Sequence, residues 1–477
     1  MPRLRSRIEN VVLIEPRFPG THFFSHVHMP LLGLPILGAI LRRMKLKVKI
    51  FCENLHPINW QEVARADLVG ISVLTTLAPR AYQIAKKVKQ IAKEVGRRIP
   101  VVMGGPHPTF LPEEALRAGA DFVVRHEGEE TLKELIEHLQ DQDGGRAAAH
   151  GGLEEIKGLS YWEGEEIRHN PDRPPVRDLD RLPLPDFSLI EGSERINCVP
   201  LQTSRGCPHD CEFCSVVQMF GRQVRYRSPE GIVEELKRTP PGRHIFIVDD
   251  NFSANPKRTL ALLEAMRKAG IKRPWSTQET VRIAQREEIM RLMRETGCTR
   301  LYQGLESFNP EALREWGKPQ TPEQIKEAIA VIHEHGFLIH GMFILGGDAD
   351  TPATIKETVN SALRLGIDTA QFFILVPPPG TRLHRRLDQA GRIIDRDWSH
   401  YDGQHVVFTP QRMSPWQLQK LAIEAYQRFY NLWRGVGWAL RGKFANSFFA
   451  FYGRGVIKRW LEEQRAYLER LRREWSY

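Results

Sequence analysis

The sequence predicts an α/β protein: a doubly wound, Rossmann-like parallel sheet, then a partial barrel of six β/α units, then a helical C-terminal region. Short apolar strands alternate with amphipathic helices from residue 11 to residue 376, and such alternation implies parallel pairing. Aromatic and basic residues interleave in the final segment. We therefore expect domains at residues 1–145, 193–400 and 401–477, with a linker at 146–192 that is rich in proline, aspartate and arginine.

The first half supplies five candidate strands, at 11–14, 47–51, 68–73, 100–103 and 122–124, with helical spacing at 34–44, 79–95, 112–117 and 130–139. Ligands of doubly wound sheets bind beyond the carboxyl ends of the strands. The residues that follow the last three strands are Ser72, Leu74 and Thr75, then Gly104, Gly105 and His107, then Glu127 and Gly128. Paired glycines let a bulky ligand approach the backbone closely, and they serve equally well in tight turns.

The second half supplies six candidate strands, at 196–202, 244–248, 275–280, 299–303, 339–345 and 369–376. Helical stretches separate them at 229–238, 257–269, 286–296, 322–335 and 351–365. Six β/α units make an incomplete barrel, and the chemistry of such barrels belongs at the carboxyl ends of the strands. A cluster of cysteines follows the first of these strands.

Composition limits the possible classes. The chain has 477 residues, of which 41% are hydrophobic and 26% charged, which is typical of a folded protein and excludes a disordered, collagen-like or coiled-coil chain. The formal net charge is +10, but residues 428–477 alone hold eleven Lys or Arg against four Asp or Glu. The basic balance therefore says little about nucleic acid. We see no secretory signal and no membrane-spanning run, and we expect a cytoplasmic location.

The strongest signal is the stretch SRGCPHDCEFC, in which Cys207, Cys211 and Cys214 have the spacing C-x3-C-x2-C. Thiolates are soft ligands for iron–sulfur clusters or zinc. Three cysteines can hold three irons of a four-iron cubane and leave the fourth open, whereas electron-transfer clusters normally have four thiolates. The alternative is a structural zinc knot with His209 as fourth ligand, although zinc sites usually pair their ligands in two separated arms and the sequence shows no second arm.

This stretch resembles the cluster loop of the radical S-adenosylmethionine superfamily, including the aromatic Phe213 before the last cysteine. The resemblance implies a 4Fe-4S cluster, S-adenosylmethionine chelated to the open iron, and reductive cleavage to methionine and a 5′-deoxyadenosyl radical. It also implies contacts with S-adenosylmethionine from Phe213 and from polar residues at the strand ends: Asp249, Asp250, Asn251, Gln278, Arg282, Glu306 and Ser307. Carboxylates would meet the ammonium group and donors the carboxylate, but any single one of these residues could instead cap a helix.

A doubly wound domain ahead of such a barrel resembles the cobalamin-binding members of this superfamily. Ser72-Val73-Leu74 matches the S-x-L pattern of the cobalamin domain, and Gly104-Gly105 matches the glycine pair that follows it. The resemblance implies that the eight strand-end residues of the first half bind cobalamin. The D-x-H-x-x-G element that supplies a histidine beneath cobalt is absent, and the corresponding stretch reads FCENLHP. We therefore assign no lower cobalt ligand, since His56 and His107 suit surface or capping roles better.

The resemblance implies a cobalamin-dependent radical methyltransferase that acts on an unactivated carbon. The aromatic and basic tail suits a hydrophobic or lipid-like substrate or a membrane surface, a nucleic-acid groove, or a helical cap on the barrel. We expect an external one-electron reductant such as flavodoxin or ferredoxin, and peripheral contact with the inner membrane surface. The alternatives are a non-methylating radical cyclase or carbon–carbon bond-forming enzyme, a zinc-binding module, and an RNA methylthiotransferase. The last is disfavoured because the N-terminal region offers only Cys52.

Overall fold

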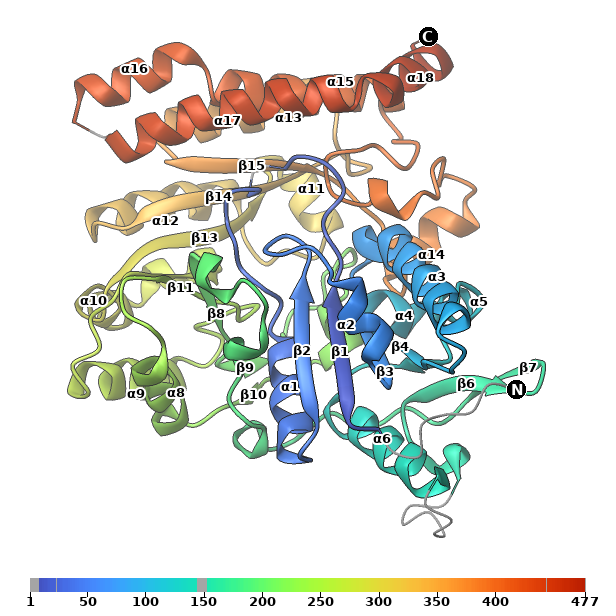
Figure 1. Cartoon of the computed structure of the whole chain (residues 1–477). Helices are drawn as coiled ribbons and strands as arrows, with labels where there is room; N and C mark the ends of the chain where they lie inside the picture. The colour runs from blue at the N-terminus through green and yellow to red at the C-terminus, as the bar shows by residue number, and fades with distance from the viewer. Residues whose placement is uncertain (1–7, 23, 144–151, 443, 477) are drawn as a thin grey trace. The chain divides into compact units, whose positions relative to one another are not determined.

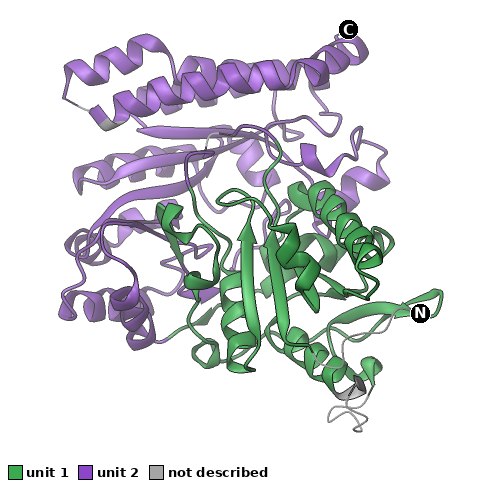
Figure 2. Ribbon diagram, viewed as in Figure 1, with its two compact units in different colours: residues 1–19, 28–200, 215–227 green, residues 20–27, 201–214, 228–477 purple. Residues whose placement is uncertain are grey.

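A computed structural model describes residues 8–22, 24–143, 152–442 and 444–476. The chain divides into two units (Figure 2). The first unit comprises residues 1–19, 28–200 and 215–227, and the second comprises residues 20–27, 201–214 and 228–477. The boundary falls inside one strand, β8, directly before the cysteine segment.

The first unit contains a seven-stranded sheet in the order β2-β1-β3-β4-β5-β6-β7 (Figure 1). Its strands are β1 (Asn10–Glu15), β2 (Lys47–Cys52), β3 (Leu68–Ser72), β4 (Val101–Gly104), β5 (Phe122–Val124), β6 (Leu159–Glu163) and β7 (Glu166–His169). The first five strands pair in parallel and confirm the predicted doubly wound sheet. The last two pair antiparallel and extend the same sheet, so the range expected as a linker contributes two strands to it.

Helices of the first unit follow the strands. They are α1 (Gly33–Arg43), α2 (Trp60–Arg65), α3 (Ala78–Glu94), α4 (Pro106–Phe110), α5 (Pro112–Arg117), α6 (Glu129–Asp143) and α7 (Val216–Phe220), with a two-residue strand β10 (Arg225–Tyr226). The α3 helix buries Ala81, Ile84, Ala85 and Val88, which lie on one face because they recur at helical spacing. The central strands are apolar on both faces, as expected for parallel strands covered on both sides.

The second unit contains a six-stranded sheet in the order β15-β14-β13-β12-β11-β8, which confirms the predicted partial barrel. Its strands are β8 (Cys198–Leu201), β11 (His244–Ile247), β12 (Trp275–Glu279), β13 (Cys298–Glu306), β14 (Leu338–Leu345) and β15 (Thr369–Ile374), and a short strand β9 (Ser204–Arg205) leads into the cysteine segment. The helices are α8 (Pro229–Arg238), α9 (Pro256–Lys268), α10 (Glu287–Glu295), α11 (Pro310–Glu315), α12 (Pro322–Glu334), α13 (Pro352–Arg364) and α14 (Arg382–Gln389). The pairings from β11 to β15 are all parallel, so their carboxyl ends share one edge.

Four helices complete the second unit: α15 (Pro415–Phe429), α16 (Leu432–Leu440), α17 (Phe444–Glu463) and α18 (Arg465–Trp475). Two tyrosines at the end of α15 form hydrogen bonds with backbone groups of the edge strand β15. The hydroxyl of Tyr430 donates to the carbonyl of Ala370 and accepts from its N–H, and the hydroxyl of Tyr426 accepts from the N–H of Phe372. The open edge of the sheet is thereby closed by side chains instead of another strand.

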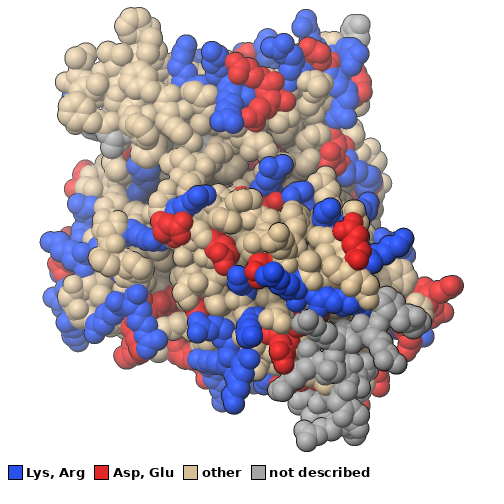
Figure 3. All heavy atoms as spheres, in the orientation of Figure 1, with Lys and Arg blue, Asp and Glu red and all other residues tan. Residues whose placement is uncertain are grey.

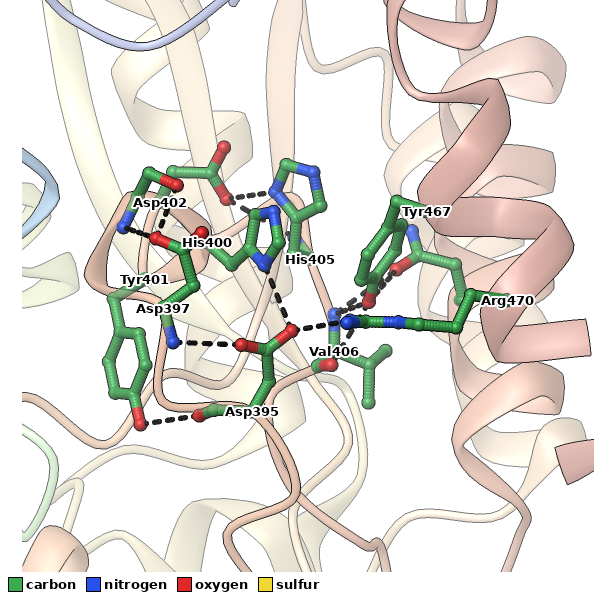
Figure 4. A network of polar contacts seen from close by, with 11 residues as sticks. Asp395, Asp397, His400, Tyr401, Asp402, His405, Val406, Tyr467 and Arg470 are labelled. Carbon is green, nitrogen blue, oxygen red and sulfur yellow. Dashed lines mark hydrogen bonds and ion pairs between the residues drawn. The ribbon is translucent and has the colours of Figure 1, made fainter. Parts of the chain in front are cut away.

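A polar network fixes α18 to the segment before α15. Figure 4 shows His400 and Arg470 directed toward the carboxylate of Asp395 from two different elements. His400 Nδ1 lies 2.9 Å and Arg470 Nη2 lies 2.7 Å from Asp395 Oδ2. The hydroxyl of Tyr467 donates to the carbonyl of Val406 at 3.0 Å. The C-terminal helix is therefore held by partly buried charge-assisted hydrogen bonds as well as by apolar contacts.

Candidate active site

The cluster loop, residues 207–214, follows β9 near the carboxyl edge of the six-stranded sheet. Its cysteines Cys207, Cys211 and Cys214 form no disulfide bond and are half-buried. The other three cysteines of the chain also form no disulfide bond and are buried: Cys52 ends β2, and Cys198 and Cys298 begin β8 and β13. Because Cys198 and Cys298 begin their strands, they lie at the opposite edge of the sheet from the cluster loop. Neither can therefore serve as a fourth cysteine ligand beside Cys207, Cys211 and Cys214.

Asp249 braces the approach to this loop. Its Oδ1 accepts hydrogen bonds from the backbone N–H groups of Thr203 (2.7 Å) and Ser204 (3.1 Å). Its Oδ2 accepts from the hydroxyls of the same two residues. Burial raises the pKa of Asp249, and the hydrogen bonds from both hydroxyls and from the Thr203 N–H act in the opposite direction, as does the charge of Arg258. Asp249, which the sequence predicted to contact S-adenosylmethionine, is thus hydrogen-bonded to the two residues that lead into the cluster loop.

A second brace comes from α14. Arg386 binds Glu212 inside the cluster loop through two hydrogen bonds, Nε to Oε1 at 2.7 Å and Nη2 to Oε2 at 3.1 Å. Its Nη1 also donates to Asp348 Oδ2 at 2.6 Å. Arg382 donates to the carbonyl of Asp210, the residue before Cys211. The loop backbone is therefore fixed on both sides, as a preorganised metal-binding loop requires.

Lys318 is a basic residue close to the thiols of Cys211 and Cys214. Its Nζ lies 2.6 Å from Glu306 Oε1, and both side chains are largely buried. Burial lowers the pKa of Lys318, but Glu306 and the nearby Cys211 outweigh burial and raise the pKa to about 12. In turn, burial raises the pKa of the Cys211 thiol and the charge of Lys318 opposes this shift. A fixed positive charge beside the thiols favours their deprotonated, metal-binding form.

The remaining residues predicted to contact S-adenosylmethionine lie on the same edge in different environments. Asp250 has solvent-exposed surface, but desolvation and the neighbouring Asp249 raise its pKa to about 7, and its charge raises the pKa of Cys207 after the larger effect of burial. Asn251 is buried, and its Oδ1 has no hydrogen-bond partner among the described residues. Gln278 is half-buried on β12, and Arg282 is exposed. Ser307 accepts from the N–H of Asn309, the N-cap of α11, and so has a structural role.

The residues present fit an iron–sulfur cluster and a small polar ligand. One loop carries three cysteines that form no disulfide bond and lie beside a cation, and a buried amide oxygen at the same edge has no hydrogen bond among the described residues. Phe213 packs edge-on against Trp316, with ring centroids 6.2 Å apart. No three His, Cys, Asp or Glu side chains of the described residues are grouped as ligands of a single metal ion. A cubane does not need such a group, because each thiolate binds a different iron.

The inward face of the six-stranded sheet is aromatic and basic. The ring of Tyr302 lies 5.0 Å from that of Phe246 and 4.6 Å from that of His340. Burial lowers the pKa of His340 to about 3, with a further contribution from Arg300, so its imidazole is neutral. Arg300 forms no hydrogen bond or ion pair with a side chain among the described residues, and its guanidinium lies 4.8 Å from the ring of Phe449. This face suits a substrate with an extended apolar body.

In the first unit, most of the predicted cobalamin residues lie at the open carboxyl edge of the sheet. Ser72, Leu74, Thr75, Gly104, Gly105 and Gly128 are all half-exposed there. Gly105 has φ +104°, and a Cβ at this position would lie 2.9 Å from the carbonyl oxygen of Val73. The turn after β4 therefore packs directly on the backbone after β3, which only glycine allows. The glycine pair shapes this edge whether or not a ligand is bound.

The other two predicted cobalamin residues are engaged within the first unit. His107 is fully buried, and its Nε2 lies 2.9 Å from the hydroxyl of Tyr82. Glu127 accepts from the N–H of Val176 at 2.6 Å and pairs with Arg225 at 2.9 Å. His56, half-buried, lies with its Nδ1 2.8 Å from the carbonyl of Pro57. All three residues therefore have a partner in the protein itself, and the complete burial of His107 differs from the surface or capping role expected from the sequence.

Sequence reasoning missed two residues of the site, Lys318 and Arg386. Both are basic residues far along the chain from the cysteines, in stretches without a motif. Lys318 follows α11 in the sequence Trp-Gly-Lys-Pro, where a buried lysine has no local signal. Only the assembled barrel shows that they reach the cluster loop and its carboxylate neighbours.

Comparisons with known proteins agree with these two units. The family model of the radical SAM superfamily matches residues 201–362, and that of the B12 binding domain matches residues 27–136. An uncharacterized methyltransferase of Pyrococcus horikoshii, PH0819, is 34% identical over 84% of this chain and 88% of its own. The cobalamin-dependent S-adenosylmethionine radical enzyme OxsB, solved with aqua-cobalamin and S-adenosylmethionine bound, has a TM-score of 0.71 at 16% identity over 94% of this chain and 72% of its own, and so shares the fold.

Two further relatives are enzymes of tetrapyrrole chemistry. The bacteriochlorophyllide d C-12(1)-methyltransferase of Chlorobaculum tepidum is 27% identical over 83% of this chain and 81% of its own. The anaerobic magnesium-protoporphyrin IX monomethyl ester cyclase of Cereibacter sphaeroides is 28% identical over 78% of this chain and 62% of its own.

Proposed function

Because the chain belongs to the cobalamin-binding radical S-adenosylmethionine enzymes, we propose that it is a methyltransferase acting on an unactivated carbon of a hydrophobic or lipid-like small molecule. The observation that carries the proposal is the cluster loop, which holds three cysteines that form no disulfide bond and has no fourth cysteine at its edge of the sheet. Such a loop leaves one iron of a cubane open to a substrate ligand.

The residues that would hold the two metal cofactors lie in different units of the chain. Cys207, Cys211 and Cys214 hold the 4Fe-4S cluster, and the open carboxyl edge of the first unit holds cobalamin. When bound, these groups supply reductive cleavage of S-adenosylmethionine and transfer of its methyl group.

Asn251 offers its unpartnered Oδ1 to the ammonium group of S-adenosylmethionine. The ammonium of Lys318 has three N–H donors, and those not used by Glu306 can meet the carboxylate of S-adenosylmethionine. Asp250, exposed beside Cys207, adds a second carboxylate for the ammonium group. Asp249 and Arg386 position the cluster loop and do not contact S-adenosylmethionine in this assignment.

The nucleoside products test the proposal. Protein purified without oxygen and loaded with iron, sulfide and hydroxocobalamin is incubated with S-adenosylmethionine, a reductant and a panel of apolar substrates. Methyl transfer to carbon yields both 5′-deoxyadenosine and S-adenosylhomocysteine, because one molecule of S-adenosylmethionine supplies the radical and another supplies the methyl group. A product mixture without S-adenosylhomocysteine contradicts methyl transfer.

A second candidate is a non-methylating cyclase or carbon–carbon bond-forming enzyme. The similarity to the magnesium-protoporphyrin IX monomethyl ester cyclase supports it. The same assay separates the two, because the cyclase reaction yields 5′-deoxyadenosine and leaves S-adenosylhomocysteine at the background level. Both reactions need the same cluster loop, so cysteine variants do not distinguish them.

We also propose two partners. The first is an external one-electron reductant such as flavodoxin or ferredoxin, which the cluster requires before S-adenosylmethionine is cleaved. The second is a membrane that the enzyme meets peripherally through its C-terminal region. Among the described residues, no helix is long and apolar enough to cross a bilayer.

A further inference from the structure

The α16 and α17 helices carry a set of exposed apolar side chains, here called the apolar patch: Leu432, Trp433, Leu440, Phe444, Phe448 and Phe451. Trp433 and Leu440 are 80% and 83% exposed, and Phe444 and Phe448 are 72% and 59% exposed. Within the described part of the chain, only Val95 and Trp162 are exposed large hydrophobic residues elsewhere. Figure 3 shows uncharged atoms gathered over α16 and the adjoining end of α17. A cluster of this kind marks an interaction surface.

The helices are anchored by their other side, so the apolar patch is a true outer surface of the second unit. Asn446 donates to the buried carboxylate of Asp368 at 2.6 Å, and Ala450 is 1% exposed. Phe449 packs on Arg300. A Cβ at Gly435 would lie 3.1 Å from the Phe451 ring, so this glycine lets α17 approach α16 closely. The patch residues pack on one another's helices at their bases, as Phe448 does on Tyr452, and still leave 44–83% of their surface exposed.

The charges that the chain itself carries between residues 425 and 461, the segment that holds the apolar patch, have a single sign. Residues 425–461 contain seven Lys or Arg and no Asp or Glu. Arg434 is turned inward, 3.9 Å from the ring of Phe429 and 4.2 Å from that of Trp438. Arg428, Arg441, Arg454, Lys458 and Arg459 are exposed. Apolar side chains flanked by cations suit the boundary between the headgroups and acyl chains of an anionic bilayer.

We propose that the apolar patch docks on the surface of an anionic lipid bilayer, with its aromatic side chains in the interface and the flanking cations on lipid phosphates. This deepens the proposed peripheral membrane contact and does not depend on the reaction that the enzyme catalyses. A second copy of the chain fits the patch less well, since pairing two patches would bring two sets of cations together. Docking by α17 also brings the inward face of the six-stranded sheet, through Phe449 and Arg300, close to the lipid.

Vesicle co-sedimentation with the full chain tests the proposal. The probes are phosphatidylglycerol–phosphatidylcholine vesicles and vesicles of phosphatidylcholine alone. The wild-type protein is expected to bind the anionic vesicles more strongly than the neutral ones. A Trp433→Ser, Leu440→Ser, Phe448→Ser triple variant is expected to bind them about tenfold more weakly, because three interfacial side chains are lost. Trp162→Ser, at the 38% exposed tryptophan of β6, is the matched control and is expected to bind like wild type.

Two outcomes overturn the proposal. One is that the triple variant binds the anionic vesicles as strongly as the wild type does, while the two proteins have the same melting temperature. The other is a wild-type dimer in sedimentation velocity that dissociates in the triple variant without any vesicle binding, which would assign the apolar patch to a second copy. Formation of 5′-deoxyadenosine and S-adenosylhomocysteine in detergent-free solution is measured in parallel. If the protein fails to bind lipid but still forms both nucleosides, the proposed membrane contact is wrong and the proposed methyl transfer is unaffected.

Discussion

Lys318 Nζ and Glu306 Oε1 lie 2.6 Å apart beside the cluster loop, in a pair whose side chains are 18% and 8% exposed. Glu306 has a positive φ of 60°, which is unusual for a residue other than glycine. The β13–β14 register also shifts between Gly304 and Glu306. The strand thus leaves regular geometry where it presents this carboxylate to the lysine, and irregular backbone of this kind is common at functional sites.

Replacing Lys318 with methionine is expected to destabilise the fold by about 3 kcal/mol, because it leaves the buried carboxylate of Glu306 without its partner. Chemical unfolding of the variant measures this cost. Lys268→Met removes a surface pair with Glu264 and is expected to cost less than about 1 kcal/mol. Equal costs for the two variants would mean that the Glu306 pair is not buried as described.

Replacing Asp249 with asparagine is expected to lower the iron content of reconstituted protein. The amide nitrogen would face the donors of Thr203 or Ser204 and would lose at least one hydrogen bond, at a cost of about 1–3 kcal/mol. Iron and sulfide analysis after anaerobic reconstitution measures the effect. Asp250→Asn is the control, since its exposed side chain does not brace the loop, and it is expected to keep a full cluster. A full cluster in the Asp249 variant would remove its positioning role.

Replacing Gly105 with alanine is expected to destabilise the first unit by about 1–3 kcal/mol and to weaken cobalamin retention. The new Cβ would meet the carbonyl oxygen of Val73, and the backbone has φ +104°. Gly96→Ala has a left-handed φ of 68° and open space around the Cβ, so it is expected to cost less than Gly105→Ala, which combines a clash with a backbone conformation that only glycine adopts readily. Similar melting temperatures for both variants would show that the close approach is unimportant.

The network around Asp395 predicts a pH dependence of stability. Burial lowers the pKa of His400, but its hydrogen bond and charge interaction with Asp395 raise it above the ordinary value. The charged histidine thus adds stability below a pH of about 6.5, and this contribution is lost as the pH rises through the raised pKa. The pKa of Asp395 is lowered to about 2, because His400 and the N–H of Asp397 outweigh burial. Its contribution is present above a pH of about 4 and is lost as the pH falls toward 2.

His400→Gln is therefore expected to lower the free energy of unfolding more at pH 5 than at pH 8. Chemical unfolding at the two pH values measures the difference. An equal loss at both values would show that His400 is neutral in the folded protein.

The elements with a strong local pattern could be predicted from the sequence. The five parallel strands of the first sheet, the six strands of the second, and helices such as α3 and α12 follow from apolar periodicity, and the cysteine spacing is itself a chemical motif. The two added strands β6 and β7 were missed because a proline-rich stretch with short apolar runs resembles a linker.

The candidate site could be predicted only in part, because a residue's partner is set by the fold. Asp249 and Asn251 both follow β11, and no local signal shows that one carboxylate is saturated by Thr203 and Ser204 while the other side chain is left unpartnered. Lys318 and Arg386 lie near the cluster loop only in the assembled partial barrel. Long-range contacts of this kind carry no periodicity.

Electron paramagnetic resonance of the reduced, reconstituted protein tests the central claim most directly. The account predicts the signal of a reduced 4Fe-4S cluster that changes on addition of S-adenosylmethionine and is lost when Cys211 is replaced by alanine. A cluster signal that S-adenosylmethionine leaves unchanged, or a full cluster without Cys211, would contradict it.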